Sequence, residues 1–269
     1  MIHTQPIKGL LLDLDGTLYH GSRMIAGADR LIEQLIRTNI PFRYVTNNSS
    51  LTPSAFADRL QGMGIAATAK EVCTSAEAAA AYIAQVKPRA RVFVIGESGL
   101  RQAVEEAGLT IVEEGADFVV QGLDRDLSYN KIARAVDQLL SGAESIMTNP
   151  DLLIPTEHGL QPGAGSIGAM IQAASGKTPT VIGKPSSILM NFALNSLGVS
   201  ASQTWMVGDS LATDIAAGKA VGCGTALVLT GLTTADNFES YAAKTGCRPD
   251  VICADLDALS SYISERNGQ

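Results

Sequence analysis

The apolar segments of this chain are short, and each is followed by a segment with helical periodicity. Residues 7–14 form the first apolar run, which closes on a Gly-Thr turn, and residues 42–45 form the second. Between them, the apolar residues of segment 31–36 recur on one helical face. Because short buried strands alternate with helices, the sequence predicts an α/β fold with a doubly wound parallel sheet, covered by helices on both faces.

The same alternation continues to about residue 229. The capping box Thr74-Ser75-Ala76-Glu77 predicts the start of an alanine-rich helix. Segment 149–165 is rich in Pro and Gly, and we expect a loop there. The other helices are expected at 53–63, 100–107, 129–140, 166–174 and 186–197, with one more near Asp214, and the other strands at 72–73, 91–95, 117–120, 180–182, 205–207 and 225–229.

Polar side chains follow four of the predicted strands. Ligands of doubly wound sheets bind beyond the carboxyl ends of the strands, and these ends share one edge of the sheet. We therefore expect the four polar groups to converge on one site, although they are far apart in the sequence. They are Asp13 with Asp15, Thr46 with Asn47, Lys184, and Asp209.

The strongest of these signals is the segment Asp13-Leu14-Asp15-Gly16-Thr17. Two carboxylates directly after a buried strand need a cation or hydrogen bonds to compensate their charge. The other groups are weaker when taken singly. Thr46-Asn47-Asn48 also suits a plain turn, Lys184 a solvated position before a helix, and Asp214 the first turn of a helix.

Composition narrows the functional classes. The 269 residues carry a formal net charge of −7 without a Lys/Arg cluster, so we expect no nucleic-acid partner. We also expect no membrane segment, because no apolar run is long enough to span a bilayer. The N-terminus does not resemble a signal peptide. Four cysteines form no C-x-x-C pair, which predicts reduced thiols and a cytoplasmic location.

Together these segments resemble the motifs of the haloacid dehalogenase superfamily. Segment 13–17 is similar to its first motif, 45–48 to the second, 183–185 to the third and 208–214 to the fourth. The segments D-L-D-G-T-L-Y, V-T-N-N-S-S, T-N-P-D, G-K-P-S and G-D-x-x-x-T-D look like the NagD-like 4-nitrophenylphosphatase branch. The resemblance spans almost the whole chain, and it implies a Rossmann-like core with a large inserted α/β cap.

The resemblance also implies a reaction. Asp13 would attack the phosphorus of a small-molecule phosphate monoester and form an aspartyl-phosphate. Asp15 would donate a proton to the leaving oxygen and later accept one from water. Asp13, Asp209 and the backbone carbonyl of Asp15 would bind Mg²⁺.

Four further residues receive supporting roles by the same resemblance. Thr46, Asn47 and Asn48 would donate hydrogen bonds to phosphate, and Lys184 would bind phosphate and offset the negative charge. Asp214 would orient Lys184 or support the metal, and a plain helix-terminal role stays open for it.

The resemblance divides the chain into a core of residues 1–86 and 179–269 and a substrate-selecting cap of residues 87–178. In the cap, Asp151, Thr156 and His158 are expected near the substrate, although an exposed loop position suits His158 as well. A homodimer formed through the cap is compatible with this plan. The glycine-rich segment 162–166 lacks the preceding strand of a nucleotide-binding loop, and we reject that interpretation.

Alternatives to a phosphatase stay open at this point. A dehalogenase needs only the first aspartate, so the presence of Asp15 argues against it. A phosphomutase would keep the same motifs, and a catalytically silent phosphate-binding protein would use the same scaffold. The silent protein would be expected to lack the nucleophile, the lysine or a metal aspartate, and all three are present here. The physiological substrate stays open between p-nitrophenyl phosphate-like esters, sugar phosphates, glycerol phosphate, phosphoglycolate, pyridoxal phosphate and nucleotides.

Overall fold

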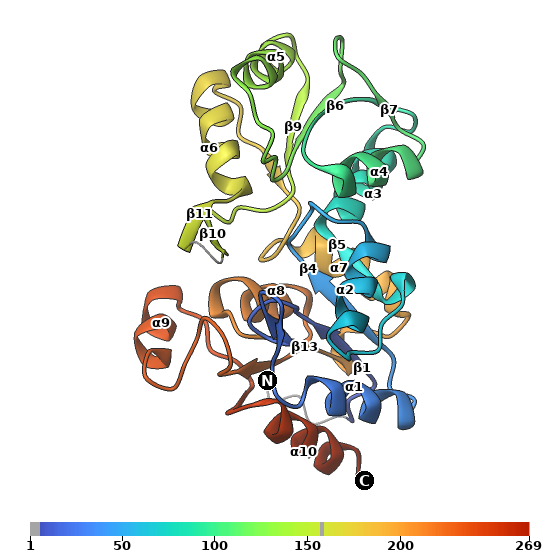
Figure 1. The fold of residues 1–269 in the computed structure, drawn as a ribbon, viewed down its shortest axis with the longest axis vertical. Coiled ribbons are helices and arrows are strands. Elements are labelled where there is room, and N and C mark those ends of the chain that lie inside the picture. The colour runs from blue at the N-terminus through green and yellow to red at the C-terminus, as the bar shows by residue number, and fades with distance from the viewer. Residues whose placement is uncertain (1–5, 157–158, 269) are drawn as a thin grey trace. The chain divides into compact units, whose positions relative to one another are not determined.

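The computed structural model describes residues 6–156 and 159–268. The chain forms two compact units (Figure 1). The first contains the chain up to Thr46, Phe56–Cys73 and the chain from Lys184 onward, and the second contains Asn47–Ala55 and Thr74–Gly183. Our assignment of 87–178 as a substrate-selecting cap stays a prediction.

The first unit is built on a six-stranded sheet in the order β15-β14-β13-β1-β4-β5. All neighbours whose register is described are parallel. After β1, the strands β4 and β5 are added on one side of it. The later strands β13, β14 and β15 are added on the other side of β1. The sheet is therefore doubly wound, as the alternation predicted, with its switch point at β1 and β13. The strands are β1 (Gly9–Leu12), β4 (Phe42–Thr46), β5 (Val72–Thr74), β13 (Thr204–Gly208), β14 (Gly224–Val228) and β15 (Val251–Cys253).

Helices cover both faces of this sheet because successive side chains of a strand point to opposite sides. On one face, Trp205 of β13 packs against Tyr262 of α10 (Leu256–Asn267) with ring centroids 5.5 Å apart. On the other face, the next residue, Met206, lies against Gly218 of α8 (Ala216–Val221). Helix α1 (Ala28–Arg37) packs with α10, and α7 (Ser187–Leu197) packs with α8.

The second unit contains a five-stranded sheet in the order β12-β9-β8-β6-β7, again parallel. Helices α5 and α6 pack together over a cluster that includes Phe93, Ile95 and Val119, while α3 and α4 pack against each other (Figure 1). The strands are β6 (Arg91–Ile95), β7 (Thr110–Ile111), β8 (Phe118–Gln121), β9 (Glu144–Met147) and β12 (Thr180–Val181), and the helices are α3 (Ser75–Val86), α4 (Ser98–Glu106), α5 (Tyr129–Leu140) and α6 (Ala164–Ser175).

Besides elements that the sequence-based prediction did not include, such as β7, β15 and α10, the structure differs from it at three places. The expected loop contains an antiparallel hairpin, β10 (Leu153–Thr156) with β11 (Gly159–Pro162). Strand β12 pairs with β9 in the second sheet, whereas we grouped it with the core strands. The helix near Asp214 begins as a π-helical turn, η3 (Leu211–Ile215), before α8.

The remaining elements connect these layers. They are the hairpin of β2 (Tyr19–His20) and β3 (Arg23–Met24), the helices α2 (Pro53–Gly62) and α9 (Phe238–Thr245), and the 3₁₀ turns η1 (Ala69–Glu71) and η2 (Ala201–Gln203). In the described part of the chain, each helix is too short or too polar to cross a lipid bilayer.

Candidate active site

Asp13 lies at the switch point of the first sheet. It follows β1 directly, and its N–H donates to the carbonyl of Val207 in β13 at 2.9 Å. Its Oδ1 accepts a hydrogen bond from Lys184 Nζ at 2.5 Å, and its Oδ2 accepts one from Thr17 Oγ1 at 3.2 Å. The carboxylate is therefore fixed at the strand end, and its side chain keeps 13% exposure.

Lys184 has a side chain that is only 2% exposed. Besides Asp13, its ammonium contacts Asp214 Oδ1 at 2.7 Å and the carbonyl of Val45 at 3.1 Å. These three acceptors match the three N–H donors of an ammonium. Burial lowers the pKa of Lys184, but the attraction of Asp13 and Asp214 outweighs it, and the net shift is upward. The lysine is therefore a fixed positive charge.

Asp214 is held by the π-helical turn that starts after β13. The N–H groups of Asp214 and Ile215 both donate to the Ser210 carbonyl at 3.1 Å, which winds the turn more widely than an α-helix. Asp214 Oδ2 accepts the Ser210 N–H at 3.0 Å, so each of its two oxygens has a partner. Asp214 is therefore ion-paired with Lys184, and its role in the reaction stays a prediction.

Asp209 follows β13, and the loop after β14 holds it. Leu232 N–H donates to its Oδ2 at 2.5 Å, and Thr233 N–H donates to its carbonyl at 3.1 Å. A side chain on Gly16 or Gly231 would collide with this carboxylate. Only glycine leaves room for Asp209 at these two points, and Gly16 also has a φ of 85° that other residues rarely adopt.

The carboxylates of Asp13, Asp209 and Asp214 offer oxygens that all lie within 4.8 Å of one another. Burial, together with the nearby charge of Asp214, raises the pKa of Asp209 to about 6. Burial raises the pKa of Asp13 as well, against the opposing effect of Lys184. One lysine does not balance three clustered carboxylates. The all-oxygen donor set therefore fits a hard divalent cation, and Asp13 and Asp209 suit it better than Asp214.

The other predicted residues of the first unit border this cluster. Thr46 ends β4 and is buried, and it directly follows Val45, whose carbonyl accepts from Lys184. Asp15 has an exposed side chain and is not part of the carboxylate cluster. Partial desolvation raises the pKa of Asp15, while Arg59 and His20 oppose the shift.

Within the second unit, two of the predicted residues, Asn47 and Asp151, are hydrogen-bonded to each other. Asn47 Nδ2 donates to Asp151 Oδ2 at 3.3 Å, and the carbonyl of Asn47 accepts from Asn149 Nδ2 at 2.8 Å and from Ser75 Oγ at 2.6 Å. Asn48 Oδ1 accepts from the N–H and the hydroxyl of Ser50, two residues later. Thr156 ends β10, and His158 lies outside the described residues.

Sequence reasoning missed several residues of the site. Thr17 belongs to the first motif, so its hydroxyl was a visible candidate. No sequence pattern marked Gly231 or Leu232. Leu232 acts through its backbone N–H, a group that a sequence does not distinguish from one residue to the next. Asn149 lies within the T-N-P-D segment, but its bond to Asn47 joins positions 102 apart in the sequence.

Two family models match the chain. One describes haloacid dehalogenase-like hydrolases and covers residues 10–110, and the other, of the same hydrolase type, covers residues 181–259. Together the two matches include Asp13, Lys184, Asp209 and Asp214. The chain belongs to the haloacid dehalogenase-like hydrolases.

Relatives define the branch. The 5′-nucleotidase YutF of Bacillus subtilis is 48% identical over 86% of this chain and 90% of its own length. An acid sugar phosphatase of Staphylococcus haemolyticus is 44% identical over 97% of this chain and 98% of its own length. The structure of a p-nitrophenyl phosphatase from Archaeoglobus fulgidus superposes with a TM-score of 0.91 at 34% identity, over 96% of this chain and 99% of that one. The chain is thus an enzyme of the phosphatase branch of this family, similar to NagD-like p-nitrophenyl phosphatases.

Proposed function

We propose that this enzyme hydrolyses small-molecule phosphate monoesters through an aspartyl-phosphate on Asp13, with Mg²⁺ as cofactor. The observation that carries the proposal is the position of Asp13. It lies at the switch point of the sheet, bound to a buried, charged lysine and within reach of the Asp209 carboxylate. A carboxylate fixed in this way cannot rotate away from a phosphorus atom in front of it, which favours in-line attack.

In the first half of the reaction, a carboxylate oxygen of Asp13 forms a bond to phosphorus while the bond from phosphorus to the leaving oxygen breaks. Asp15 gives its proton to that leaving oxygen. Its raised pKa keeps more of the protonated acid near neutral pH than an ordinary aspartate would. Its exposed carboxyl is accessible to a substrate, as this role requires.

In the second half, Asp15 takes a proton from water as the water oxygen attacks phosphorus. The bond between phosphorus and Asp13 breaks, and inorganic phosphate leaves. Lys184 stabilises the negative charge of the phosphoryl oxygens throughout, since Asp214 and Val45 hold its ammonium beside Asp13. Thr46 would donate its hydroxyl to one of these oxygens, and Asn47 and Asn48 are assigned as further donors.

Asp13, Asp209 and the backbone carbonyl of Asp15 would hold Mg²⁺. When bound, the ion supplies positive charge between the anionic nucleophile and the anionic phosphate. Asp214 is assigned to Lys184 and not to the metal, because its two oxygens already meet Lys184 and the Ser210 N–H.

The substrate class we propose is sugar phosphates or nucleoside monophosphates, with p-nitrophenyl phosphate as a convenient surrogate. The support is the similarity to relatives named for a 5′-nucleotidase and an acid sugar phosphatase. A cytoplasmic location is proposed with it, and the four free cysteines are consistent with that location.

The test is hydrolysis of p-nitrophenyl phosphate with Mg²⁺ and with EDTA, by the wild type and Asp13→Asn. We expect metal-dependent turnover that falls by about 10³-fold or more in the variant. Asp58→Asn, an exposed aspartate of α2, serves as the matched control and should keep full activity. Turnover that survives Asp13→Asn would rule out Asp13 as the nucleophile. A panel of sugar phosphates and nucleotides then ranks the substrates by kcat/KM.

A further inference from the structure

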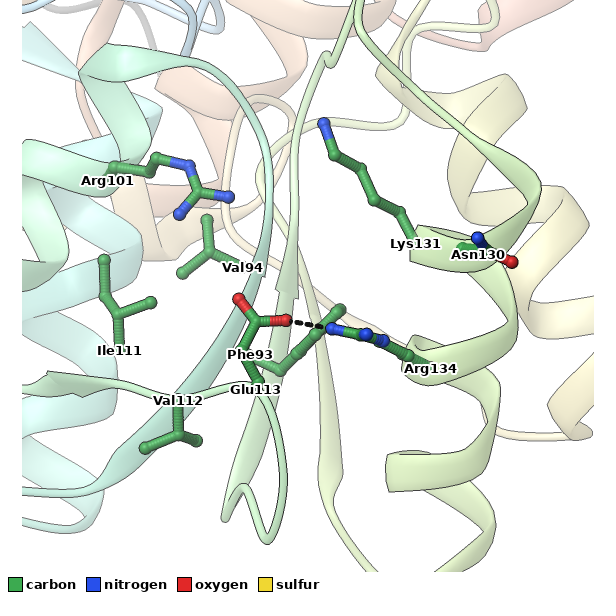
Figure 2. A pocket seen from close by; sticks show the side chains of 9 residues that line it. All are labelled: Phe93, Val94, Arg101, Ile111, Val112, Glu113, Asn130, Lys131 and Arg134. Atoms are coloured by element: carbon green, nitrogen blue, oxygen red, sulfur yellow. Dashed lines mark hydrogen bonds and ion pairs between the residues drawn. The ribbon is translucent and has the colours of Figure 1, made fainter.

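A pocket of about 270 Å³ lies within the second unit. None of its lining residues belongs to the catalytic cluster, by which we mean Asp13, Lys184, Asp209 and Asp214. Its apolar part is made by β6, by the end of β7 and by Val112. Its polar side chains come from α4, from α5 and from Glu113, which follows β7 (Figure 2). The pocket is lined by Phe93, Val94, Arg101, Ile111, Val112, Glu113, Asn130, Lys131 and Arg134.

The charge of this lining is unusual for the protein. Three basic side chains and one acidic side chain face the pocket, whereas the chain as a whole has a net charge of −7. Figure 2 shows Arg101 on one side of the strands and Lys131 with Arg134 on the other. Arg134 pairs with Glu113 at 2.6 Å, and Lys131 pairs with Asp124 at 3.1 Å.

Arg101 differs from the other two basic residues. Its side chain is only partly exposed, and it makes no hydrogen bond or ion pair with any residue in 6–156 or 159–268. Its guanidinium carries five N–H donors, which suit the two oxygens of a carboxylate or the oxygens of a phosphate. An anion in the pocket would therefore meet a charged donor with no competing partner among the described residues.

The edge of strand β6 supplies a second, independent observation. Strand β7 pairs with β6 only at Arg91 and Val92. The last backbone bond between them runs from Val112 N–H to the Val92 carbonyl at 3.0 Å, and after Val112 the chain turns away. The part of β6 beyond Val92 is thus an open edge that faces the pocket.

Val94 has its backbone groups on this open edge. Neighbouring residues of a strand direct their N–H and C=O to opposite sides. Val92 bonds to the β7 side, while the Ile95 carbonyl accepts from Gly122 next to β8, so Val94 faces the β7 side. In the described ranges no backbone group pairs with it there, although Val94 is only 4% exposed. The N–H and C=O of Val94 are therefore placed to bond with a polar group that enters the pocket.

We propose that this pocket binds a small organic anion. Its carboxylate or phosphate group lies against Arg101 and the Val94 N–H, and its apolar body lies over Ile111 and Val112. The volume lies just below the range of about 300–1,000 Å³ that is usual for ligand sites, so the ligand is small. The site is separate from the reaction and adds a binding function to the second unit.

The experiment is a titration of the full, ¹⁵N-labelled chain, followed by amide resonances, with benzoate, phenylphosphonate and the neutral benzamide. We expect saturable shifts of the Val94 amide with at least one of the two anions and much weaker binding of benzamide. The better anion identifies the group, carboxylate or phosphate. Site-specific resonances separate this pocket from phenylphosphonate bound at the catalytic cluster.

Arg101→Gln tests the charged donor. Losing one charge-assisted hydrogen bond should weaken the binding of the better anion about 10-fold or more. Arg37→Gln, an exposed arginine of α1, is the matched control and should bind like the wild type. Both variants should keep the dispersed spectrum of a folded chain and the wild-type rate on p-nitrophenyl phosphate. Absence of saturable shifts at Val94 with both anions, equal binding of benzamide, or unchanged affinity in Arg101→Gln would each overturn the proposal.

Discussion

Lys184 and Asp214 form an ion pair of 2.7 Å in which each side chain is only 2% exposed. The pair brings the strand-end lysine and the π-helical turn together behind Asp13, which Lys184 also contacts. A second carboxylate in this position orients the ammonium, much as an outer partner orients a metal ligand. Asp214 therefore helps to orient the ammonium group that also contacts Asp13.

Asp214→Asn should slow catalysis without abolishing it. The variant keeps the side-chain volume but removes the charge that orients Lys184, and loss of such an orienting partner costs about 10–100-fold in activity. The measurement is kcat on p-nitrophenyl phosphate at saturating Mg²⁺, with Asp58→Asn as the surface control. An unchanged kcat would mean that Asp13 and the Val45 carbonyl hold the lysine sufficiently.

Three glycine substitutions should separate steric collision from backbone strain around Asp209. In Gly16→Ala the new methyl group collides with Asp209 and the backbone is strained by its positive φ. In Gly231→Ala there is only the collision with Asp209. In Gly21→Ala there is only the backbone strain, since Gly21 has a φ of 56° and open space around it. We expect weaker Mg²⁺ activation in the two variants that collide with Asp209, and only a loss of about 1 kcal/mol of stability in Gly21→Ala. Activity titrated with Mg²⁺, together with urea unfolding, checks this. Normal Mg²⁺ activation in Gly231→Ala would contradict the packing argument.

The stability of the metal-free enzyme should depend on the protonation of Asp209. Its pKa is raised from 3.8 to about 6 in the folded protein, so the folded state binds the proton more tightly than the unfolded state does. The resulting stabilisation is complete below pH 3.8 and is lost as the pH rises through about 6.

Urea unfolding in EDTA, at several values between pH 4 and 7, should therefore show a loss of stability that is smaller in Asp209→Asn. Addition of Mg²⁺ at pH 7 should raise the melting temperature of the wild type, since the ion binds the folded state. Identical pH profiles for the wild type and Asp209→Asn would count against the raised pKa.

Asn149→Ala should impair substrate turnover through Asn47. The amide of Asn149 donates to the Asn47 carbonyl at 2.8 Å, and its oxygen accepts the Asp151 N–H at 3.1 Å. Loss of these bonds costs about 1–2 kcal/mol, which corresponds to about 10-fold in kcat/KM if Asn47 binds phosphate. Steady-state kinetics is the measurement, and Asn195→Ala, an exposed asparagine of α7, is the control. Unaltered kcat/KM in Asn149→Ala would remove Asn47 from the proposed phosphate donors.

The sequence by itself determined the α/β alternation and most helix positions. Periodicity and caps are local properties, and segments such as Thr74-Ser75-Ala76-Glu77 carry both. The capping box forms as expected, with Glu77 N–H donating to Thr74 Oγ1 at 3.1 Å. The strand-end rule also brought Asp13, Lys184 and Asp209 to one place, because parallel strands share their carboxyl edge.

Other features were decided only by the tertiary structure. Strand β12 pairs with β9 in the second sheet. The sequence of β12 alone does not contain this information, because pairing also depends on the residues of the neighbouring strand. The ion pair of Asp214 with Lys184 joins positions 30 apart in the chain, so it forms only once these two segments have packed together. The hydrogen bond from Leu232 to Asp209 is donated by a backbone N–H. Every residue except proline has such a group, so the sequence does not mark this donor. Local patterns thus determine elements and strand ends, whereas pairing partners, orienting contacts and burial exist only once distant segments have packed.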